Sequence, residues 1–160
     1  MIKIDCVWFN EFICVHRNGD VQRIIQGDCG QGKAGEIVFV PNNKNCVDGY
    51  NNLRDGKGKN RQRHRLVAHC FQNLKLENFK DKVDHIDRNP LNNSNANLRI
   101  VTNQQNTFNT ASRGTTYKAC LNKWEAQICV NGKKIYLGIF PTEAEAHQAY
   151  LDAKLIYHVI

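Results

Sequence analysis

The stretch Val83–Asn109, VDHIDRNPLNNSNANLRIVTNQQNTFN, decides the fold of the chain around it. Residues 83–87 begin with a β-branched side chain and lead into an Arg-Asn-Pro turn, a pattern that predicts a short strand closed by proline. The loop at 91–96 is almost entirely asparagine and serine, whose side chains hydrogen-bond nearby backbone, so a structured connection is expected. Residues 97–101 then predict a second strand.

A helix is expected to follow the two strands directly. Thr102 stands where a helix N-cap belongs, and Gln105 follows three residues later, which is the spacing of a capping box. In that motif each of the two side chains satisfies a backbone N–H that the first turn of a helix leaves without a partner. The helix should therefore begin at Asn103. This places Asn106 in its first turns, where it is able to face back across the two strands.

The side chains of this strand, strand and helix suit the hydrolysis of a phosphodiester. A base must take a proton from water, and a neutral imidazole such as that of His85 does this near physiological pH. A hard cation must neutralise the charge that builds on the phosphate, and it prefers carboxylate and amide oxygens such as those of Asp84 and Asn106. Adjacent residues of a regular strand point to opposite faces, so the strand must twist or end for Asp84 and His85 to reach one site.

These residues resemble the motif of the HNH endonucleases of the ββα-metal type, and within them most of all the small homing endonucleases of phage introns. The resemblance implies that His85 is the general base and that Asp84 and Asn106 hold one divalent ion, Mg²⁺ or Mn²⁺. It implies that Asn97 is the asparagine that ties the loop to the first strand. Asn106 stands where histidine is usual, a departure that concerns metal preference more than activity. The alternative is a Thr-capped helix on a polar hairpin without catalysis.

The charge of the chain points to a polyanionic partner. There are 22 basic and 15 acidic residues, with a formal net charge of +7. Residues 57–65 are cationic at every second position, so a strand over this range would put the cations on one face, against a line of phosphates. The residues expected to bind DNA in this way are Lys57, Lys59, Arg61, Arg63 and Arg65. The alternative is a solvated edge strand that its charge protects from aggregation.

The segment before this run is expected to be a small β module. Asn18-Gly19 predicts a tight hairpin between strands at 12–15 and 21–24, and residues 36–40 predict a further strand. No apolar run of 18 residues is present and the start lacks the apolar core of a signal peptide, so a soluble, intracellular (cytoplasmic) protein is expected. None of the seven cysteines belongs to a Cys-x-x-Cys pair, which argues against a disulfide framework and against zinc knuckles.

The end of the chain has the alternation of a β-hairpin. Asn131-Gly132 is a strong signal for a two-residue turn, and side chains of 124–130 alternate between apolar and polar. Counting back from the turn, the expected pairs are Val130–Lys133, Cys129–Lys134, Ile128–Ile135, Gln127–Tyr136 and Ala126–Leu137. Thr142 and Glu145 form a second capping box, which predicts the start of a helix that covers the inner face of the hairpin.

Residues 113–159 resemble the DNA-binding domain of the plant ethylene-response factors. The likeness is carried by WEAQI at 124–128, NGK at 131–133, YLGIF at 136–140 and TEAEA at 142–146. The family places a three-stranded sheet in the DNA major groove, which is wide enough for a β-ribbon. The residues of this part that are expected to bind DNA are Arg113, Lys118, Gln127, Lys134 and Tyr136, together with Arg99 of the preceding core.

The sequence as a whole predicts an α+β protein of three domains. Residues 1–56 form an N-terminal β module, 57–110 a central ββα-metal nuclease core, and 111–160 a three-stranded antiparallel sheet packed on one helix. By resemblance, the expected function is metal-dependent hydrolysis of duplex DNA to 5′-phosphate and 3′-hydroxyl ends, as a nick by a monomer or a double-strand break by a homodimer. The alternatives are a sequence-specific DNA-binding regulator with a decayed nuclease core, and a packaging factor that does not read sequence.

Overall fold

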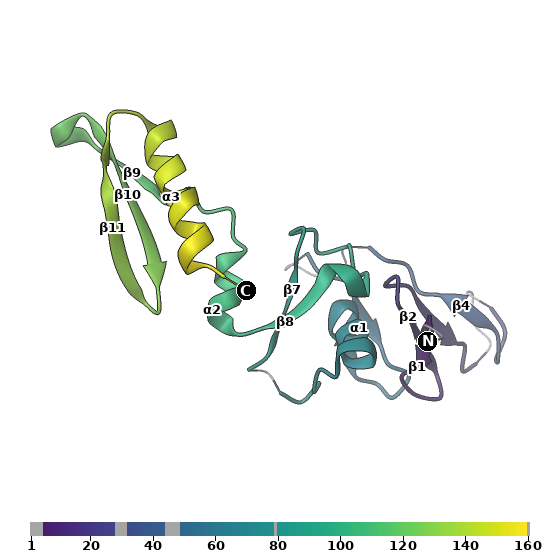
Figure 1. The fold of residues 1–160 in the computed structure, drawn as a ribbon. Helices are drawn as coiled ribbons and strands as arrows, with labels where there is room; N and C mark the ends of the chain where they lie inside the picture. Colours follow the sequence, from purple (N-terminus) through teal and green to yellow (C-terminus); the bar gives the residue numbers. More distant parts are fainter. Residues whose placement is uncertain (1–4, 28–31, 44–48, 79, 160) are drawn as a thin grey trace. The chain divides into compact units, whose positions relative to one another are not determined.

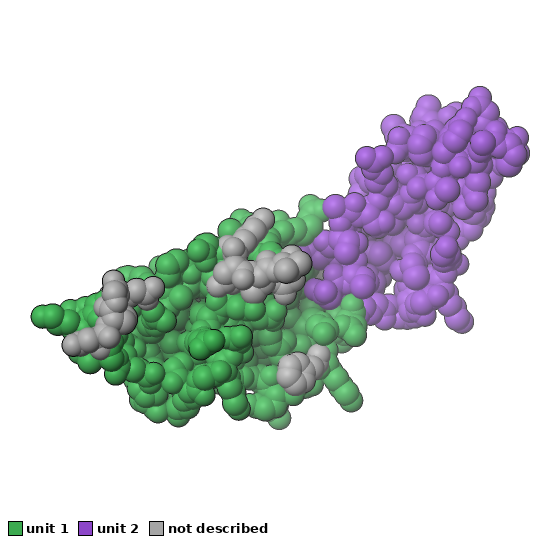
Figure 2. All heavy atoms as spheres, turned by 180° about the vertical axis from the view of Figure 1, so that it is seen from behind, with its two compact units in different colours: residues 1–103 green, residues 104–160 purple. Residues whose placement is uncertain are grey.

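The computed structural model describes residues 5–27, 32–43, 49–78 and 80–159. Contacts within the chain divide it into two compact units, residues 1–103 and 104–160, which Figure 2 shows in different colours. Strands and helices alternate along both units, so the predicted α+β class is confirmed. Within the described ranges, none of the helices combines the length and the apolar character that crossing a bilayer requires.

Unit 1 opens with a four-stranded antiparallel sheet (Figure 1). The strands lie in the order β1 (Cys6–Trp8), β2 (Ile13–His16), β3 (Val21–Ile24) and β4 (Ile37–Phe39). The hairpin between β2 and β3 turns at Gly19, whose φ of +95° is a conformation that glycine adopts at little cost. The predicted N-terminal β module is therefore confirmed, and it also contains β1, which the sequence pattern did not predict.

The predicted strand of alternating cations over 57–65 is wrong. The structure has a short hairpin of β5 (Asn52–Arg54) and β6 (Asn60–Gln62), followed at once by helix α1 (Arg63–Gln72). Gly56 and Gly58 have φ of +79° and +82°, so the chain turns where a strand was expected. The period-two pattern therefore runs through a turn, a short strand and a helix, and its cations do not share one strand face.

The central stretch forms a hairpin followed by a short helix. Strand β7 (Lys82–His85) pairs antiparallel with β8 (Leu98–Val101), and the 3₁₀ turn η1 (Asn95–Asn97) lies in the loop between them. Helix α2 (Asn103–Phe108) begins at the residue that the capping-box spacing predicted. The predicted order of strand, strand and helix is therefore confirmed.

One hydrophobic core holds unit 1 together. The N-terminal sheet, α1 and the β7–β8 hairpin all contribute buried side chains to it, among them Ile13, Val15, Val21, Leu66, Val67, Val83 and Leu98. Full burial of a side chain of this size is worth about 1.5–3 kcal/mol. The N-terminal sheet and the β7–β8 hairpin therefore stabilise each other through α1. The segments on the two sides of residue 56 share this core. The predicted domain division at that residue stays a prediction.

Arg63, the first residue of α1, is 0% exposed, and its side chain joins three parts of unit 1. Its guanidinium donates to Asn51 Oδ1 at 2.7 Å and to the carbonyl oxygens of Gly19 (3.1 Å), Val40 (2.6 Å) and Pro41 (2.9 Å). Burial lowers the pKa of Arg63 to about 10, so the group still carries its charge near neutral pH. The expected contact of Arg63 with DNA is therefore wrong, because the folded chain already surrounds this side chain.

Unit 2 is a three-stranded antiparallel sheet with one helix lying along it (Figure 1). The sheet has the order β11 (Lys133–Phe140), β10 (Lys123–Val130) and β9 (Thr115–Lys118), and the 3₁₀ turn η2 (Ala119–Leu121) joins β9 to β10. Helix α3 (Glu143–Tyr157) is capped by Thr142, whose side chain accepts a hydrogen bond from the backbone N–H of Glu145 at 3.3 Å. The predicted sheet and helix are confirmed.

The pairing of β10 with β11 is confirmed near the turn and shifts further along. Asn131 and Gly132 both have positive φ, and the pairs from Val130–Lys133 to Gln127–Tyr136 form as predicted. Beyond Gln127 a bulge shifts the register, so Ala126 lies opposite Gly138. The predicted Ala126–Leu137 pair is therefore wrong, because side-chain alternation on one strand does not reveal an extra residue on its partner.

The inner face of this sheet is covered by α3. Ile128 of β10 is buried with Tyr150 and Ala153 of the helix, and Leu137 packs against them. Gly114, just before β9, has a φ of +66°, and a Cβ at this position would overlap the ring of Tyr150. Close packing of the helix on the chain therefore requires glycine there. On the outer face of the sheet, Cys129, Lys134 and Tyr136 are exposed.

Candidate functional site

Asp84 and His85 are neighbours at the end of β7, and both are buried. Their exposed fractions are 7% and 5%. Asp84 lies opposite Arg99 of β8, and His85 lies opposite Leu98. Because β7 ends at His85, the regular alternation of side chains also ends at this pair. The hairpin thus removes an acid and an imidazole from bulk water. Charges in such a buried site interact more strongly than they do in water.

The carboxylate of Asp84 is held by Arg99. The Arg99 Nε donates to Asp84 Oδ2 at 2.8 Å, and the Arg99 Nη2 lies 2.7 Å from the same oxygen. The side chain of Arg99 is 29% exposed, so its positive charge lies partly at the surface. The structure therefore places Arg99, which was expected to contact DNA, directly beside the expected metal ligand.

The imidazole of His85 is held by an asparagine and lies among aromatic rings. Its Nε2 lies 3.1 Å from Oδ1 of Asn93, a residue that is 2% exposed. The ring of Tyr50 stacks on it with centroids 5.9 Å apart, and the ring of His64 meets it edge-on at 5.2 Å. These contacts fix the plane of the His85 ring in the buried site.

His64, on α1, has a pKa far from that of an exposed imidazole. Burial lowers the pKa of His64 to about 3, and the charges of His85 and Arg65 act in the same direction. Its Nδ1 is buried, and the residues that the structure describes offer it no hydrogen-bond partner. His64 is therefore neutral at physiological pH, and its uncharged ring packs against the ring of His85.

This burial predicts that unit 1 loses stability in weak acid. An unfolded chain has an imidazole pKa of about 6.5, whereas folding lowers the pKa of His64 to about 3. Between these values the unfolded state binds more protons. The contribution of His64 is complete above about pH 6.5 and is lost as the pH falls toward 3, by up to about 1.4 kcal/mol for each pH unit. Urea unfolding at about pH 7.5 and about pH 5 measures the change in unfolding free energy.

A His64→Gln variant is the control for this prediction. Glutamine does not titrate, so the difference in unfolding free energy between the two pH values should shrink in the variant. Carboxylates and other histidines titrate equally in both proteins, so the comparison isolates His64. Equal pH dependence in the two proteins would contradict the assignment.

Asn97 cross-links the loop between β7 and β8. Its Nδ2 donates to Asp87 Oδ1 at 2.9 Å and to the carbonyl of Asn92 at 2.8 Å, while its Oδ1 accepts from the Asp87 backbone N–H at 3.1 Å. Its backbone carbonyl accepts from the N–H of Ile86 at 2.9 Å. Hydrogen bonds, first from the backbone N–H of Asn89 and then from Asn92 and Asn97, lower the pKa of Asp87. The loop that follows His85 is therefore an ordered structure.

Asn106 lies on α2 and its side chain is exposed. The division between the two units follows Asn103, the first residue of this helix, so Asn106 is counted with unit 2 and the Asp84–His85 pair with unit 1. The expected convergence of Asp84, His85 and Asn106 on one cation stays a prediction.

The chemical type of the expected ligands suits a hard divalent cation. Asp84 offers a carboxylate and Asn106 an amide oxygen, and such oxygens are the ligands that Mg²⁺ and Mn²⁺ prefer. Among the residues that the structure describes, no cluster of three or more His, Cys, Asp and Glu side chains could hold a metal. The Asp84 carboxylate that such a cation would use is the one that Arg99 contacts.

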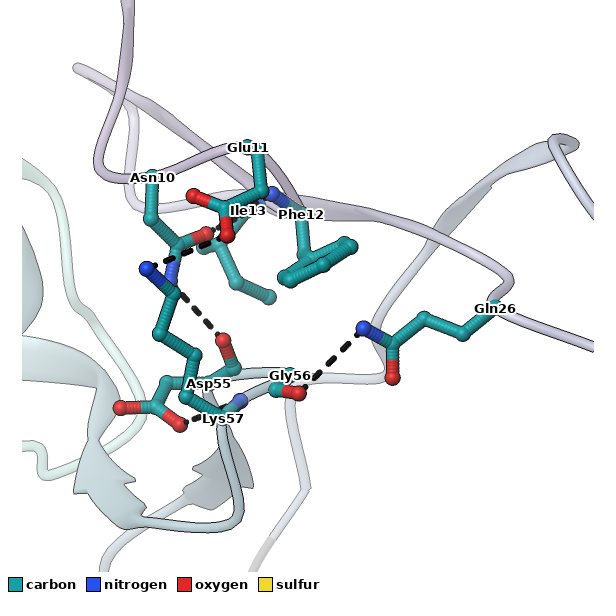
Figure 3. Close-up of polar contacts among 8 residues, drawn as sticks. All are labelled: Asn10, Glu11, Phe12, Ile13, Gln26, Asp55, Gly56 and Lys57. Atoms are coloured by element: carbon teal, nitrogen blue, oxygen red, sulfur yellow. Dashed lines mark hydrogen bonds and ion pairs between the residues drawn. The ribbon is translucent and has the colours of Figure 1, made fainter.

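The remaining cations of the 57–65 run differ in their surroundings. Lys57 pairs with Glu11 at 3.1 Å on the surface, as Figure 3 shows, and Lys59 is exposed. Arg61 pairs with Asp55 at 3.1 Å, and Arg65 donates to the backbone carbonyls of Asp81 (3.0 Å) and Asn78 (3.2 Å). Lys57 and Lys59 remain accessible to a phosphate, whereas Arg61 and Arg65 are partly occupied by the fold.

The expected DNA-binding residues of unit 2 lie on or beside its sheet. Gln127 lies opposite Tyr136 on the neighbouring strand. These two residues and Lys134 are on the face of the sheet that is opposite to the buried Ile128. Lys118 pairs with Glu125 at 3.2 Å, and Arg113 pairs with Glu143 at 3.3 Å. A cavity of about 410 Å³ is lined by Arg113, Gln127 and Lys134 among others. Polar and basic groups therefore gather around one part of this unit.

Sequence reasoning missed Asn93, the partner of the His85 imidazole. Asn92 and Asn93 are adjacent asparagines in the same loop, but Asn92 donates to Asp87 Oδ2 in an exposed position whereas Asn93 is buried. The asparagine-rich composition indicated a structured loop. It gave no sign of which amide faces inward.

The part of the chain that contains these residues matches a known family. Residues 80–108 match the family model described as HNH endonuclease, and this range includes Asp84, His85, Asn97 and Asn106. The resemblance that the sequence predicted for this segment is therefore confirmed. The resemblance of residues 113–159 to the ethylene-response factors stays a prediction.

Two curated relatives share part of the sequence. An uncharacterized HNH endonuclease of Acanthamoeba polyphaga mimivirus is 42% identical over 71 residues, which cover 42% of this chain and 38% of the relative. The DNA endonuclease I-HmuI of Bacillus phage SP01 is 37% identical over 100 residues, which cover 56% of this chain and 55% of the relative. The chain therefore matches 38% to 55% of the length of these relatives.

A solved structure is also similar to this chain. It concerns DNA binding and cleavage by the HNH homing endonuclease I-HmuI, with 27% sequence identity and a TM-score of 0.45. The match covers 88% of this chain and 78% of the other.

Proposed function

We propose that this chain, whose residues 80–108 carry the HNH endonuclease motif, is a metal-dependent endonuclease that hydrolyses duplex DNA. The observation that carries the proposal is the buried Asp84–His85 pair at the end of a β-hairpin that lies within the matched segment. The net charge of +7 favours a polyanionic substrate. The relative from Bacillus phage SP01 is named a DNA endonuclease, which supports DNA as that substrate.

His85 acts as the general base in this proposal. It takes a proton from a water molecule that attacks the phosphorus opposite the leaving 3′ oxygen, which leaves 5′-phosphate and 3′-hydroxyl ends. General base catalysis by a positioned imidazole typically accelerates a reaction about 10²–10⁴-fold. Asn97 supports this role by holding the chain that follows His85 through its contacts with Asp87 and Asn92.

Asp84 and Asn106 would hold the divalent cation, Mg²⁺ or Mn²⁺. When bound, the cation supplies positive charge that stabilises the charge developing on the phosphate and the leaving oxygen. Arg99 lies 2.7 Å from the Asp84 carboxylate and is partly exposed, so it adds a fixed positive charge next to the same phosphate. In this proposal Arg99 contacts the DNA at the phosphate that reacts.

Relaxation of supercoiled plasmid tests the proposed function. With Mg²⁺ or Mn²⁺ the protein should convert the plasmid to open-circular or linear DNA, and EDTA should stop the conversion. Open circles indicate a nick and linear molecules a double-strand break. DNA ligase should reseal the nicks without further treatment, because it requires a 5′-phosphate and a 3′-hydroxyl. Persistent supercoiled plasmid in both metals, or equal cleavage in EDTA, would contradict the proposal.

A DNA-binding regulator with a decayed nuclease core is the second candidate. It is favoured by the ion pair in which Arg99 already occupies Oδ2 of Asp84, the carboxylate that a cation would need. The two candidates differ in the plasmid experiment, because a regulator binds one duplex tightly and never cuts it in any metal.

The outer face of the unit 2 sheet is proposed to hold the duplex. Lys134→Ala should weaken binding of a duplex at every sequence, by about fivefold to tenfold, and should lower the slope of log K against log salt by about 0.9. The reason is that one fewer cation neutralises a phosphate and releases its counterion. Fluorescence anisotropy of a labelled duplex at several salt concentrations measures both quantities.

Lys154→Ala is the matched control for this substitution. Lys154 is also in unit 2, but it lies on α3 and donates to the backbone carbonyl of Thr110 at 3.2 Å. Its loss should leave the salt dependence nearly unchanged. An equal loss of affinity in the two variants would place the duplex elsewhere than on the outer face of the sheet.

A further inference from the structure

The loop that follows β7 packs against the turn between β2 and β3. A Cβ on Gly19 would lie 2.5 Å from the backbone carbonyl carbon of Asn93, so the two chains approach as closely as glycine allows. The backbone N–H of Asn95 donates to the carbonyl of Arg17 at 2.8 Å. The N-terminal sheet therefore supports the same loop that carries the partner of His85.

The carbonyl of Leu91 fixes the orientation of two amide side chains. It accepts from Nδ2 of Asn42 at 2.7 Å and from Nδ2 of Asn93 at 3.3 Å. A carbonyl oxygen can only accept hydrogen bonds, so each asparagine must turn its NH₂ group, and not its oxygen, toward Leu91. The short contact from Asn42 gives the stronger of the two constraints.

The contact between the two asparagines agrees with this orientation. Nδ2 of Asn93 donates to Oδ1 of Asn42 at 3.1 Å, which is the complementary arrangement of an amide NH₂ and an amide oxygen. With its NH₂ group used by Asn42 and Leu91, Asn93 presents Oδ1 to His85. That oxygen lies 3.1 Å from His85 Nε2 and can only accept, so Nε2 must carry the proton.

We propose that Asn93, oriented by Asn42, is a positioning residue that holds His85 in the Nε2–H tautomer and so makes Nδ1 the nitrogen that accepts a proton. A neutral imidazole has one protonated nitrogen and one with a lone pair, and the hydrogen bond to the first determines which is the second. The catalytic meaning of this tautomer rests on the proposed function. The tautomer itself does not.

The inference gives the N-terminal sheet a part in the site. Asn42 follows β4 and belongs to the predicted N-terminal module, whereas His85 belongs to the predicted nuclease core. The path from Asn42 through Asn93 to His85 consists of two hydrogen bonds. The module therefore does more than bury apolar surface, since it also determines which nitrogen of the imidazole is basic.

Nuclear magnetic resonance of the imidazole nitrogens tests the tautomer without DNA or metal. The free full-length chain is labelled with ¹⁵N and studied at about pH 8.5, about two units above the ordinary imidazole pKa, and His85→Gln identifies the signals. The wild type should show a protonated Nε2 and an unprotonated Nδ1. In Asn93→Leu, which cannot accept a hydrogen bond, the two nitrogen shifts should move toward each other as the tautomers exchange.

Three further variants separate this role from a merely structural one. Asn93→Asp keeps an acceptor oxygen toward Nε2 and should keep the wild-type tautomer, and Asn42→Leu should shift the signals in the direction of Asn93→Leu by a smaller amount. Asn92→Leu is the matched control, because it removes an exposed amide of the same loop that does not face His85, and its His85 signals should stay as in the wild type. A wild-type His85 protonated at Nδ1, or an Asn93→Leu spectrum equal to that of the wild type, would overturn the inference.

Cleavage kinetics give the catalytic consequence. Asn93→Leu should lower kcat about 10- to 100-fold, by analogy with the loss of a hydrogen-bond partner that orients a metal-bound histidine, with KM for the duplex little changed. Asn93→Asp should recover most of kcat. An unchanged kcat in Asn93→Leu would overturn the positioning role. If the wild type cuts no DNA, the proposed function fails while the nitrogen spectra still decide the tautomer.

Discussion

Replacement of His85 by alanine is expected to lower the rate of DNA cleavage about 10²–10⁴-fold, the contribution of a positioned general base. The alanine variant keeps Asp84 and the surrounding hairpin, so its affinity for the duplex should stay close to that of the wild type. Single-turnover cleavage of a defined substrate gives the rate, and anisotropy under the same conditions with Ca²⁺ gives the affinity. The loss should therefore appear in the chemical step.

His16→Ala is the control for the loss of an imidazole. His16 lies on β2, where its ring contacts Gln22 and Phe39. Its replacement should leave the cleavage rate near that of the wild type. Wild-type cleavage by the His85→Ala protein would mean that another group activates the water.

Replacement of Arg63 by methionine is expected to destabilise unit 1 by about 3–5 kcal/mol, because several buried acceptors lose their donor at about 1–3 kcal/mol each. Methionine fills a similar volume but donates nothing, so Asn51 and the carbonyls of Gly19, Val40 and Pro41 lose their donors inside the fold. Urea unfolding at pH 7 gives the change in unfolding free energy. A loss of this size is a large part of the stability of a small domain.

Lys57→Met is the matched control, because it removes a cation of the same run by the same substitution. The Lys57–Glu11 pair is more than half exposed on both sides, so water screens it and its loss should change the unfolding free energy far less than the loss of Arg63 does. Similar free energies for the two variants would contradict the structural role of Arg63. A large loss of unfolding free energy for Arg63→Met alone would agree with a structural role for this buried side chain.

The central hairpin and helix could be predicted because their signals are local. The β-branched Val83 and the turn signal at residues 88–90 predicted the first strand, although β7 spans Lys82–His85 and ends two residues before the predicted range does. The spacing of Thr102 and Gln105 predicted the first residue of α2. Each of these signals acts within a few residues of the backbone that it shapes. The Asn131-Gly132 turn and the pairs next to it were predictable for the same reason.

The cationic run shows where such reasoning fails. Every second residue from 57 to 65 is basic, yet two glycines turn the chain and α1 begins at Arg63. The side chain of Arg63 is buried because carbonyls from residues 19, 40 and 41 converge on it. Those partners are more than 20 residues away in sequence, so no local pattern could reveal that this cation faces inward.

The sequence by itself determined which residue types stand at the proposed site. It supplied an acid next to a histidine, asparagines at the spacing of a known motif, and local signals strong enough to place them on a strand, a strand and a helix. Tertiary structure alone decided which groups surround them. Arg99 reached Asp84 through strand pairing, and Asn93 met His85 and Asn42 because the N-terminal hairpin packs against the loop. The physical reason is that hydrogen bonds between distant segments depend on how the whole core packs.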